Sequence, residues 1–233
     1  MGRAMGLLVG AMLVVTLSAC GVGTPQDTSA EATQTGADVR ERLAAGLAAV
    51  GSDAEMVRDR RTTLTPVDAA WLQGWQIFDI QLNTEYRSSR FYAALSDDGT
   101  AVDLDDSPES FAEMTRSAHV SVNDASLAVD VGNLYLDVTR GFRRYSYRID
   151  SVSAIEWPEL NPAEQQQVAE FETKYDAIVQ PSVAEPSGTG WTVTAWTIYD
   201  RSLVRHRLEI AADGAVQDTQ EVVATDLLLP QTF

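Results

Sequence analysis

Cysteine, lysine and histidine are scarce in this chain of 233 residues: it has one cysteine, Cys20, one lysine, Lys174, and two histidines, His119 and His206. A single cysteine excludes a disulfide within the chain, so the fold must be stabilised by packing. Neither histidine has a second nitrogen or sulfur ligand nearby in the sequence, which excludes the common zinc motifs. The chain also lacks a phosphate-binding loop, a Gly-x-Gly-x-x-Gly motif and a Gly-x-Ser-x-Gly nucleophile elbow. No local motif therefore predicts a catalytic residue, a cofactor or a metal ion.

Positive charge is also in short supply. The chain has 17 basic and 34 acidic residues, for a formal net charge of −17 at pH 7. Such a chain repels phosphate backbones and anionic lipid head groups, so we expect no nucleic-acid partner. The charge is consistent with solubility alone, and also with a preference for cationic partners or metal ions.

The longest apolar run lies at the N-terminus. Arg3 precedes an uncharged stretch over residues 5–17, which the small residues Ser18 and Ala19 follow. The stretch is shorter than the roughly 20 apolar residues that a membrane-spanning helix needs. The layout is that of a signal peptide, which we predict over residues 1–19.

The residues around the cysteine, Leu-Ser-Ala-Cys at positions 17–20, resemble the lipobox of bacterial lipoproteins. The resemblance covers residues 1–21 only, and the rest of the chain resembles no family. It implies that Cys20 becomes the first residue after cleavage and carries lipid, such as palmitate, as an anchor. It also implies a place on the extracytoplasmic side of the cell membrane or, since no retention aspartate stands at Gly21, of the outer membrane. The alternative is an ordinary secretory signal peptide with a cysteine at its cleavage site.

The next segment is rich in glycine, serine, threonine and alanine, and it lacks large apolar groups. Such a segment cannot form a core, so we predict a flexible linker over residues 20–37. The remaining residues, 38–233, are enough for one globular α+β domain, with a candidate subdivision near residues 157–161.

Three segments have the apolar spacing of amphipathic helices. The first spans residues 38–50, with its stripe at Val39, Leu43, Leu47 and Val50. The second begins at Pro108 after a capping Ser107 and turns Phe111 and Met114 to one side. The third begins at Pro162 after Asn161, where Glu164 can complete a capping box, and it ends before Pro181. Its expected buried stripe is Val168, Phe171, Tyr175 and Ile178.

Other segments alternate with a period of two, as half-buried antiparallel strands do. In residues 75–82, Phe78, Ile80 and Leu82 share one face. Further strands are predicted at 91–95, 127–131, 134–138, 145–149, 191–199 and 203–210. Turns are predicted at Asp98-Gly99, Gly132-Asn133, Arg140-Gly141 and Asp213-Gly214. The expected fold class is α+β, with one or more antiparallel sheets and about three amphipathic helices.

A weak internal repeat relates residues 74–103 to residues 190–218. Both begin Gly-Trp, continue as two strand-like segments and reach Asp-Gly at nearly the same spacing. An amphipathic helix precedes each at some distance. The pattern indicates two related helix-plus-meander units, and the alternative is that two unrelated hairpins look alike.

Two charged clusters and one histidine are candidates for chemistry. The acidic run 97–106 could offer oxygen ligands to calcium, but Ala94 stands where the EF-hand order needs the first ligand, so a hairpin turn with solvated acids is favoured. On a strand, His206 shares a face with Val204, Leu208 and Ile210, which predicts a hydrogen-bonded core histidine in preference to a catalytic base. His119 is expected in a loop.

The second cluster, over residues 140–148, is basic. Arginine interleaved with tyrosine is typical of interfaces, so we predict a partner or anion surface there. The alternative is an edge strand whose arginines pair with the chain's own acids. The candidate residues are Arg140, Arg143, Arg144, Tyr145, Tyr147 and Arg148.

The expected function is that of a membrane-anchored, non-catalytic binding module of the cell envelope. Its partner would be an envelope protein or a small ligand. The alternative is a carrier or sensor of a small hydrophobic ligand or lipid, which needs a cavity lined by residues such as Trp75, Phe78, Phe171 and Trp196. A third alternative is that the protein is an enzyme, which would require His119 or His206 to meet a carboxylate in an open cleft.

Overall fold

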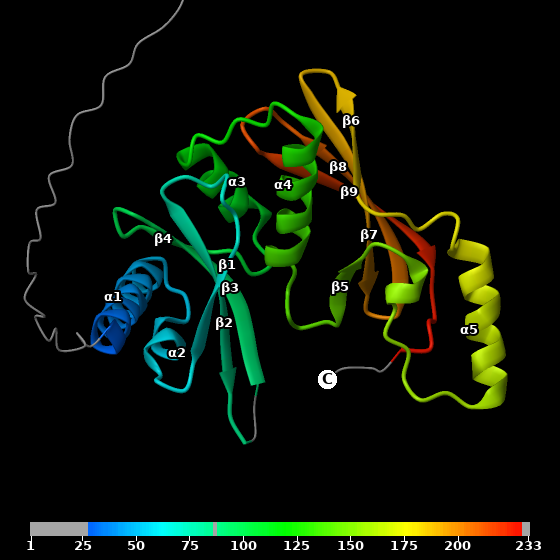
Figure 1. Cartoon of the computed structure of the whole chain (residues 1–233), viewed down its shortest axis with the longest axis horizontal. Helices are drawn as coiled ribbons and strands as arrows, with labels where there is room; N and C mark the ends of the chain where they lie inside the picture. Colours follow the sequence, from blue (N-terminus) through cyan, green and yellow to red (C-terminus); the bar gives the residue numbers. More distant parts are fainter. Residues whose placement is uncertain (1–27, 86–87, 230–233) are drawn as a thin grey trace, which may run out of the picture.

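Two antiparallel sheets, with helices between and outside them, make up the fold (Figure 1). The computed structural model of the protein describes residues 28–85 and 88–229. The first sheet has the strand order β1-β2-β3-β4, made of Thr63–Val67, Trp75–Asn83, Ser88–Ser96 and Ala101–Asp103. The second contains β5 (Ser146–Ile149), β6 (Val183–Ser187), β7 (Gly190–Tyr199), β8 (Ser202–Ile210) and β9 (Val216–Ala224). The predicted α+β class is confirmed.

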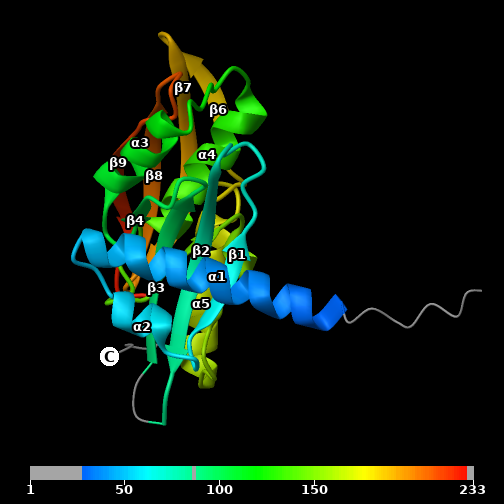
Figure 2. The same ribbon diagram turned by 90° about the vertical axis from the view of Figure 1, so that its left-hand side faces the viewer.

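The helix α1 (Thr28–Ala49) packs across one face of the first sheet, with the short helix α2 (Ala54–Arg58) beside it (Figure 2). Leu43 and Leu47 are completely buried against Phe78 and Ile80 of β2. The predicted helix over residues 38–50 is thus present, but it begins ten residues earlier, inside the predicted linker. Alanine, glutamate and glutamine in residues 29–34 favour a helix, which the linker prediction neglected. Val50 is wrongly placed in the stripe, since it lies after the helix and is 59% exposed.

The helix α4 (Ala125–Val138) corrects the prediction for residues 127–138. Two strands and a turn at Gly132-Asn133 were expected, but the segment is one helix, which the side chain of Asp124 caps at the N–H of Leu127. α4 lies between the two sheets and is covered on most sides, so its polar stripe is narrow (Figure 1). Its polar residues still recur at helical spacing, at Ser126, Asp130, Asn133 and Asp137, a signal that the strand prediction neglected. Its buried residues are Ala128, Val131, Gly132, Leu134, Tyr135, Leu136 and Val138.

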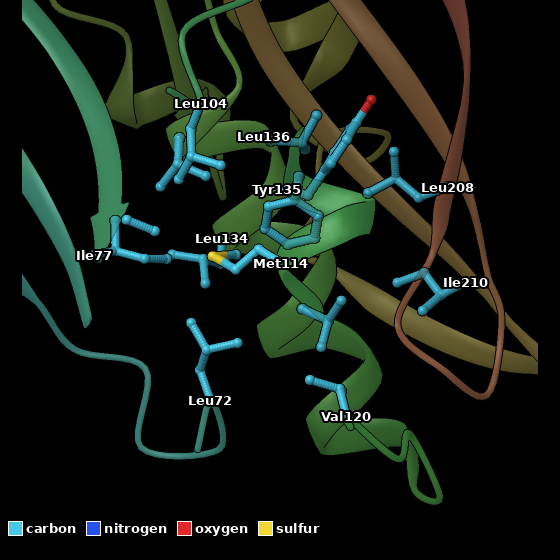
Figure 3. Close-up of a cluster of buried hydrophobic side chains, with 14 of the residues drawn as sticks. Leu72, Ile77, Leu104, Met114, Val120, Leu134, Tyr135, Leu136, Leu208 and Ile210 are labelled. Atoms are coloured by element: carbon cyan, nitrogen blue, oxygen red, sulfur yellow. The ribbon is translucent and has the colours of Figure 1, made fainter. Parts of the chain in front are cut away.

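The main hydrophobic core fills the space around α4 and α3 (Pro108–Ser117). Figure 3 shows Leu72 and Ile77 on the side of the first sheet and Leu208 and Ile210 on the side of the second, with the helices between. Gly132 allows the close approach of α4 to the second sheet, because a Cβ there would lie 3.0 Å from Cδ1 of Leu208. One core therefore joins the two sheets.

The edge of the second sheet is built from two separate segments. β5 pairs with residues 196–199 of β7, and β6 pairs with residues 190–194 of the same strand in the same direction. The two thus occupy one strand position, interrupted by residues 150–182. This insertion contains the 3-10 helix η1 (Val152–Ala154) and α5 (Pro162–Tyr175), and it packs against the opposite face of the sheet from α4, around Trp196 and Ile198.

The end structures of α3 and α5 match the sequence prediction. Ser107 caps α3, and Asn161 with Glu164 forms the predicted capping box of α5. Phe171 and Tyr175 pack on the insertion's own core, but Ile178 lies beyond the helix end and is 47% exposed. The predicted subdivision near residues 157–161 falls between η1 and α5, inside the insertion.

The repeat detected in the sequence corresponds to a similarity of topology. Residues 74–103 contain β2, β3 and β4, and residues 190–218 contain β7, β8 and the start of β9. Each series is an antiparallel meander with a helix, α1 or α4, packed on one face. The unpredicted strands β1 and β6 flank β2 and β7 in the same way.

None of the helices in residues 28–85 and 88–229 is both long enough and apolar enough to cross a bilayer. The predicted signal peptide and the anchor at Cys20 lie outside the residues that the structure describes.

Candidate functional site

A cavity of about 620 Å³ lies where the C-terminal half of α4 meets the second sheet, and we call it the α4 cavity. The loop over residues 140–146, which we call the arginine loop, forms a second wall. Residues 105–108, before α3, form a third. The α4-facing side of β7, β8 and β9 forms its floor. The cavity therefore joins segments that lie up to about a hundred residues apart in the sequence.

The arginine loop contributes three guanidinium groups to this cavity. Arg140 is half-buried, donates from one terminal nitrogen to the backbone oxygen of Ser146, and lies 5.1 Å from the ring centre of Phe142. Arg143 and Arg144 are exposed, and Arg144 lies 5.7 Å from the ring centre of Tyr199. Among the described residues, none of these three arginines forms an ion pair. Arg140 acts on Asp137 and Arg143 on Asp105 through charge alone. The exposed guanidinium groups of Arg143 and Arg144 remain available to a ligand.

The floor contains a hydrogen-bonded row of three side chains. The strand register sets His206 opposite Ala195 and Gln220, so Thr197 and Asp218 are its diagonal neighbours on the same face. Thr197 Oγ1 lies 2.8 Å from Nε2 of His206, and Nδ1 of His206 lies 2.9 Å from Oδ2 of Asp218. Because a carboxylate only accepts, Nδ1 donates to Asp218, and Nε2 of the neutral ring then accepts from Thr197.

This arrangement confirms that His206 is a hydrogen-bonded core histidine, and it adds that the residue lines a cavity. The sequence did not single out Thr197 or Asp218. The alternation of apolar residues along β8 placed His206 on the inner face, but only the pairing with β7 and β9 identifies its partners. Thr197 and Asp218 could be found from the sequence only if the register of these three strands were already known.

Three side chains at the cavity carry a buried polar atom that has no hydrogen-bond partner among the described residues. These atoms are Oδ1 of Asp105, Nε of Arg140 and Oδ1 of Asp218. Buried polar atoms without a partner are rare in proteins, and they often mark a place where a ligand or an ordered water binds. The cavity thus offers both acceptors and a donor.

The titration of two cavity residues reflects their burial. Burial, together with the charges of Asp103 and Asp106, raises the pKa of Asp105 to about 6, against the opposing effects of the Phe142 N–H and Arg143. Burial and the charge of Asp218 raise the pKa of Tyr135 to about 12. Tyr135 therefore keeps its hydroxyl proton at neutral pH, and Figure 3 shows this hydroxyl directed away from the apolar side chains.

A second cavity, of about 600 Å³, lies on the other side of the arginine loop, and we call it the loop cavity. Arg140 and Arg144 line both cavities. In the loop cavity, Phe142 lies between Arg140 and Arg90, whose guanidinium carbon is 4.9 Å from the ring centre. Arg90 is held by a two-point ion pair with Asp79, at 2.8 and 2.7 Å. The arginine loop is therefore a wall shared by two cavities.

The six residues of the predicted partner or anion surface separate into three groups. Arg140, Arg143 and Arg144 line the α4 cavity, and Tyr145 and Tyr147 line the loop cavity. Arg148 turns away from both and pairs with Asp150 at 2.9 Å and with Asp137 at 3.6 Å. The alternative prediction, an edge strand whose arginines pair with the chain's own acids, fits β5, which lies at the sheet edge and contains Arg148. It does not describe Arg140, Arg143 and Arg144.

The two ends of the acidic run 97–106 lie in different parts of the structure. Asp97 and Asp98 form the predicted hairpin turn between β3 and β4, where Gly99 has a φ of 93°. Asp105 and Asp106, at the other end, line the α4 cavity. In the part of the chain that the structure describes, no group of three acidic, histidine or cysteine side chains could hold a metal ion.

Two further candidates lie away from these cavities. His119 follows α3 in a loop, as predicted, and lines none of the cavities described in this section. The aromatic residues expected around a hydrophobic ligand are dispersed. Phe78 packs under α1, Trp75 on the main core, and Phe171 and Trp196 in the core of the insertion.

Comparison of the chain with known protein families, with curated proteins and with solved structures finds no match.

Proposed function

We propose that the protein is a binding module whose α4 cavity takes a small ligand with a carboxylate or phosphate group. The observation that carries this proposal is that Arg140, Arg143 and Arg144 line one cavity without forming an ion pair among the described residues. A guanidinium offers two parallel N–H donors, which match the geometry of both anions. On a chain with a net charge of −17, this loop is a local exception to the acidic charge.

The proposal includes a tether to the extracytoplasmic face of a cell-envelope membrane through lipid on Cys20. Its support is the Leu-Ser-Ala-Cys resemblance at residues 17–20. Two or three acyl chains would hold the module firmly at a bilayer, since each buried CH₂ contributes about 0.8 kcal/mol. The module would then act on ligands near that membrane.

The alternative of a carrier for a hydrophobic ligand has less support. Such a carrier needs a cavity lined by apolar and aromatic side chains. Instead, Phe78, Phe171 and Trp196 are used in separate cores, and the α4 cavity is lined mainly by charged and polar groups. The lining favours a polar ligand.

A second candidate function is hydrolysis, because Thr197, His206 and Asp218 have the order of nucleophile, general base and orienting acid. The binding role is favoured because Thr197 lies on β7, an inner strand of the second sheet, and is only 5% exposed. Hydrolysis of p-nitrophenyl acetate tests the candidate. Turnover that Thr197→Ala abolishes would support an enzyme, and equal rates for both chains would count against it.

The binding proposal is tested by calorimetric titration of phosphate and citrate at low salt. The protein would be the chain from Gly21 on, which keeps every element that the structure describes. Replacing Arg143 and Arg144 together by alanine should weaken binding about tenfold or more, since hydrogen bonds to charged groups contribute about 1.5–3 kcal/mol each. The matched control is Arg60→Ala, an exposed arginine that lines none of the three cavities. Equal binding by the double variant and the control variant would contradict the proposal.

Native mass spectrometry of the same chain identifies a ligand retained on purification. A bound mass that is lost on denaturation and is anionic would support the proposal. An extracted lipid would favour the carrier instead.

A further inference from the structure

The acidic groups of the α4 cavity restrict which anion can enter it. Of the five buried side-chain polar atoms without a partner among the described residues, three belong to residues that line this cavity. Two of them are carboxylate oxygens, on Asp105 and Asp218, and one is the Nε donor of Arg140. A complementary ligand must therefore supply donors as well as acceptors.

Asp218 offers an acceptor on the floor of the cavity. Its side chain is 9% exposed, and its Oδ2 accepts both from Nδ1 of His206 at 2.9 Å and from Nε2 of Gln220 at 2.8 Å. Its Oδ1 has no partner in the described part of the chain. A carboxylate that is nine-tenths buried and has one unpaired oxygen is destabilised by the loss of its hydrogen bonds to water. A charged or strongly polar donor on a ligand would replace them.

Asp105 forms a second acceptor on the wall before α3. The backbone N–H of Phe142 donates to it, and Arg143 acts on it through its charge without an ion pair. Burial raises the pKa of Asp105 to about 6, which means that its negative charge is poorly compensated in the free protein. A cation bound beside it would supply that compensation.

The acidic and basic groups of the cavity come from different segments of the chain. The guanidinium groups of Arg143 and Arg144 lie in the exposed arginine loop, whereas Asp218 lies on the buried floor and Asp105 on the wall. A ligand with only negative groups would bring them against the floor, and one with only positive groups would meet the arginines. A molecule with one group of each sign satisfies both sets.

We infer that the α4 cavity binds a zwitterion with a primary ammonium and a carboxylate, the chemistry of an amino acid or a short peptide. This inference rests on the proposed function. The arginine loop holds the carboxylate, and Asp218 and Asp105 accept from the ammonium. An ammonium has three donors, enough for both unpaired carboxylate oxygens. The volume of about 620 Å³ is within the range of small-molecule sites.

The test is calorimetric titration of the full chain, purified in a non-ionic detergent, with alanyl-alanine and two modified forms of it. N-acetylation removes the ammonium charge, and C-terminal amidation removes the carboxylate. The unmodified dipeptide should bind about tenfold more tightly than either form, the difference expected for loss of one charge-assisted hydrogen bond. Asp218→Asn should reduce its affinity to that of the N-acetyl form, while Asp130→Asn, an exposed acid on α4, should leave it unchanged.

Asp105→Asn keeps the test valid if Asp218→Asn does not fold. It should weaken binding of the dipeptide and leave binding of the N-acetyl form unchanged. Equal affinity of the dipeptide and its N-acetyl form would overturn the inference that the ligand is a zwitterion. The proposed function would still stand if binding depends on Arg143 and Arg144. If phosphate, citrate and all three peptides fail to bind, both proposals are wrong.

Discussion

The imidazole Nδ1 of His206 lies 2.9 Å from Oδ2 of Asp218, and the two side chains are only 7% and 9% exposed. With Thr197 on the other ring nitrogen, the pair forms a polar row on the sheet face toward α4, beside the apolar residues Ala195 and Leu208. Such a row is stable only when its members satisfy one another, because an unpaired buried polar group loses the hydrogen bonds of water. The row also forms the floor of the α4 cavity, so stability and binding depend on the same residues.

Removing one member of this pair should be more costly than its hydrogen bond alone. His206→Ala leaves a buried carboxylate without its main donor, and a loss of about 3–5 kcal/mol in the free energy of unfolding is expected. Asp218→Ala should cost about 1–3 kcal/mol. The double variant should cost less than the sum of the two, which urea denaturation of all four chains would measure. Gln220→Ala is the control, since Gln220 is an exposed donor to the same oxygen and should cost under about 1 kcal/mol. Simple additivity would show that the pair is not coupled.

Two glycines of α1 form a matched pair that tests how this helix packs and where it begins. A Cβ on Gly46 would lie 2.6 Å from the Cβ of Ala101 and 2.9 Å from its backbone nitrogen, whereas a Cβ on Gly36 would meet nothing within 4 Å. Gly46→Ala should therefore destabilise the protein by about 1–3 kcal/mol through overpacking, despite the better helix propensity of alanine. Gly36→Ala should stabilise it by up to about 1 kcal/mol. Both are measured by urea denaturation. No gain from Gly36→Ala would mean that residue 36 belongs to a linker, as the sequence predicted.

The titration of Asp105 should make stability fall as the pH rises. Its pKa is raised to about 6 in the folded protein, so between about pH 4 and pH 6 the folded state binds more protons than the unfolded state. The stabilising effect of the neutral carboxyl is complete below about pH 4 and is lost through pH 6. Because the group is half-exposed and screened, we expect an effect of about 1 kcal/mol.

The comparison that isolates this effect is between the unmodified chain and Asp105→Asn, which should gain about 1 kcal/mol relative to it from pH 4 to pH 7. Asp130→Asn serves as the control and should show no such relative change. Parallel stability curves for the unmodified chain and the Asp105→Asn variant would contradict the raised pKa.

The anchor predicted from the sequence has its own test. The full chain expressed in a bacterium should partition into the detergent phase of Triton X-114, and its intact mass should exceed that of the chain from Cys20 on by the mass of the lipid. Cys20→Ala should remain in the aqueous phase or keep its signal peptide. A cleaved wild-type chain without added mass would indicate an ordinary secretory signal peptide instead.

Sequence reasoning succeeded where structure depends on neighbours along the chain. The cap of α3 at Ser107 and the capping box of α5 at Asn161 and Glu164 were predicted because each involves residues three positions apart. The strand around His206 was predicted because one face is buried and the other is largely polar. The strand around Phe78 was predicted from the same alternation, although its second face is also partly buried, since Ile77 lies in the main core. The predicted place of Ile178 in the buried stripe of α5 is wrong, because the helix ends before it.

The failure at residues 127–138 has a physical cause. Val131, Leu134, Leu136 and Val138 are all buried because α4 is covered by both sheets, and their spacing fits two short strands as well as one helix. Two signals for a helix were available. Asp124 is a good N-cap that a strand would not need, and the polar residues Ser126, Asp130, Asn133 and Asp137 recur at helical spacing.

The α+β class, the antiparallel hairpins and the helix caps could be read from the sequence, since these arise from propensities and side-chain contacts within a few residues. The sequence also singled out Arg140, Arg143 and Arg144. That these arginines line one cavity with Asp218, Asp105 and His206 is visible only in the folded structure. The reason is that strand register and the packing of α4 between two sheets bring together residues up to about a hundred positions apart, and no local pattern encodes that distance.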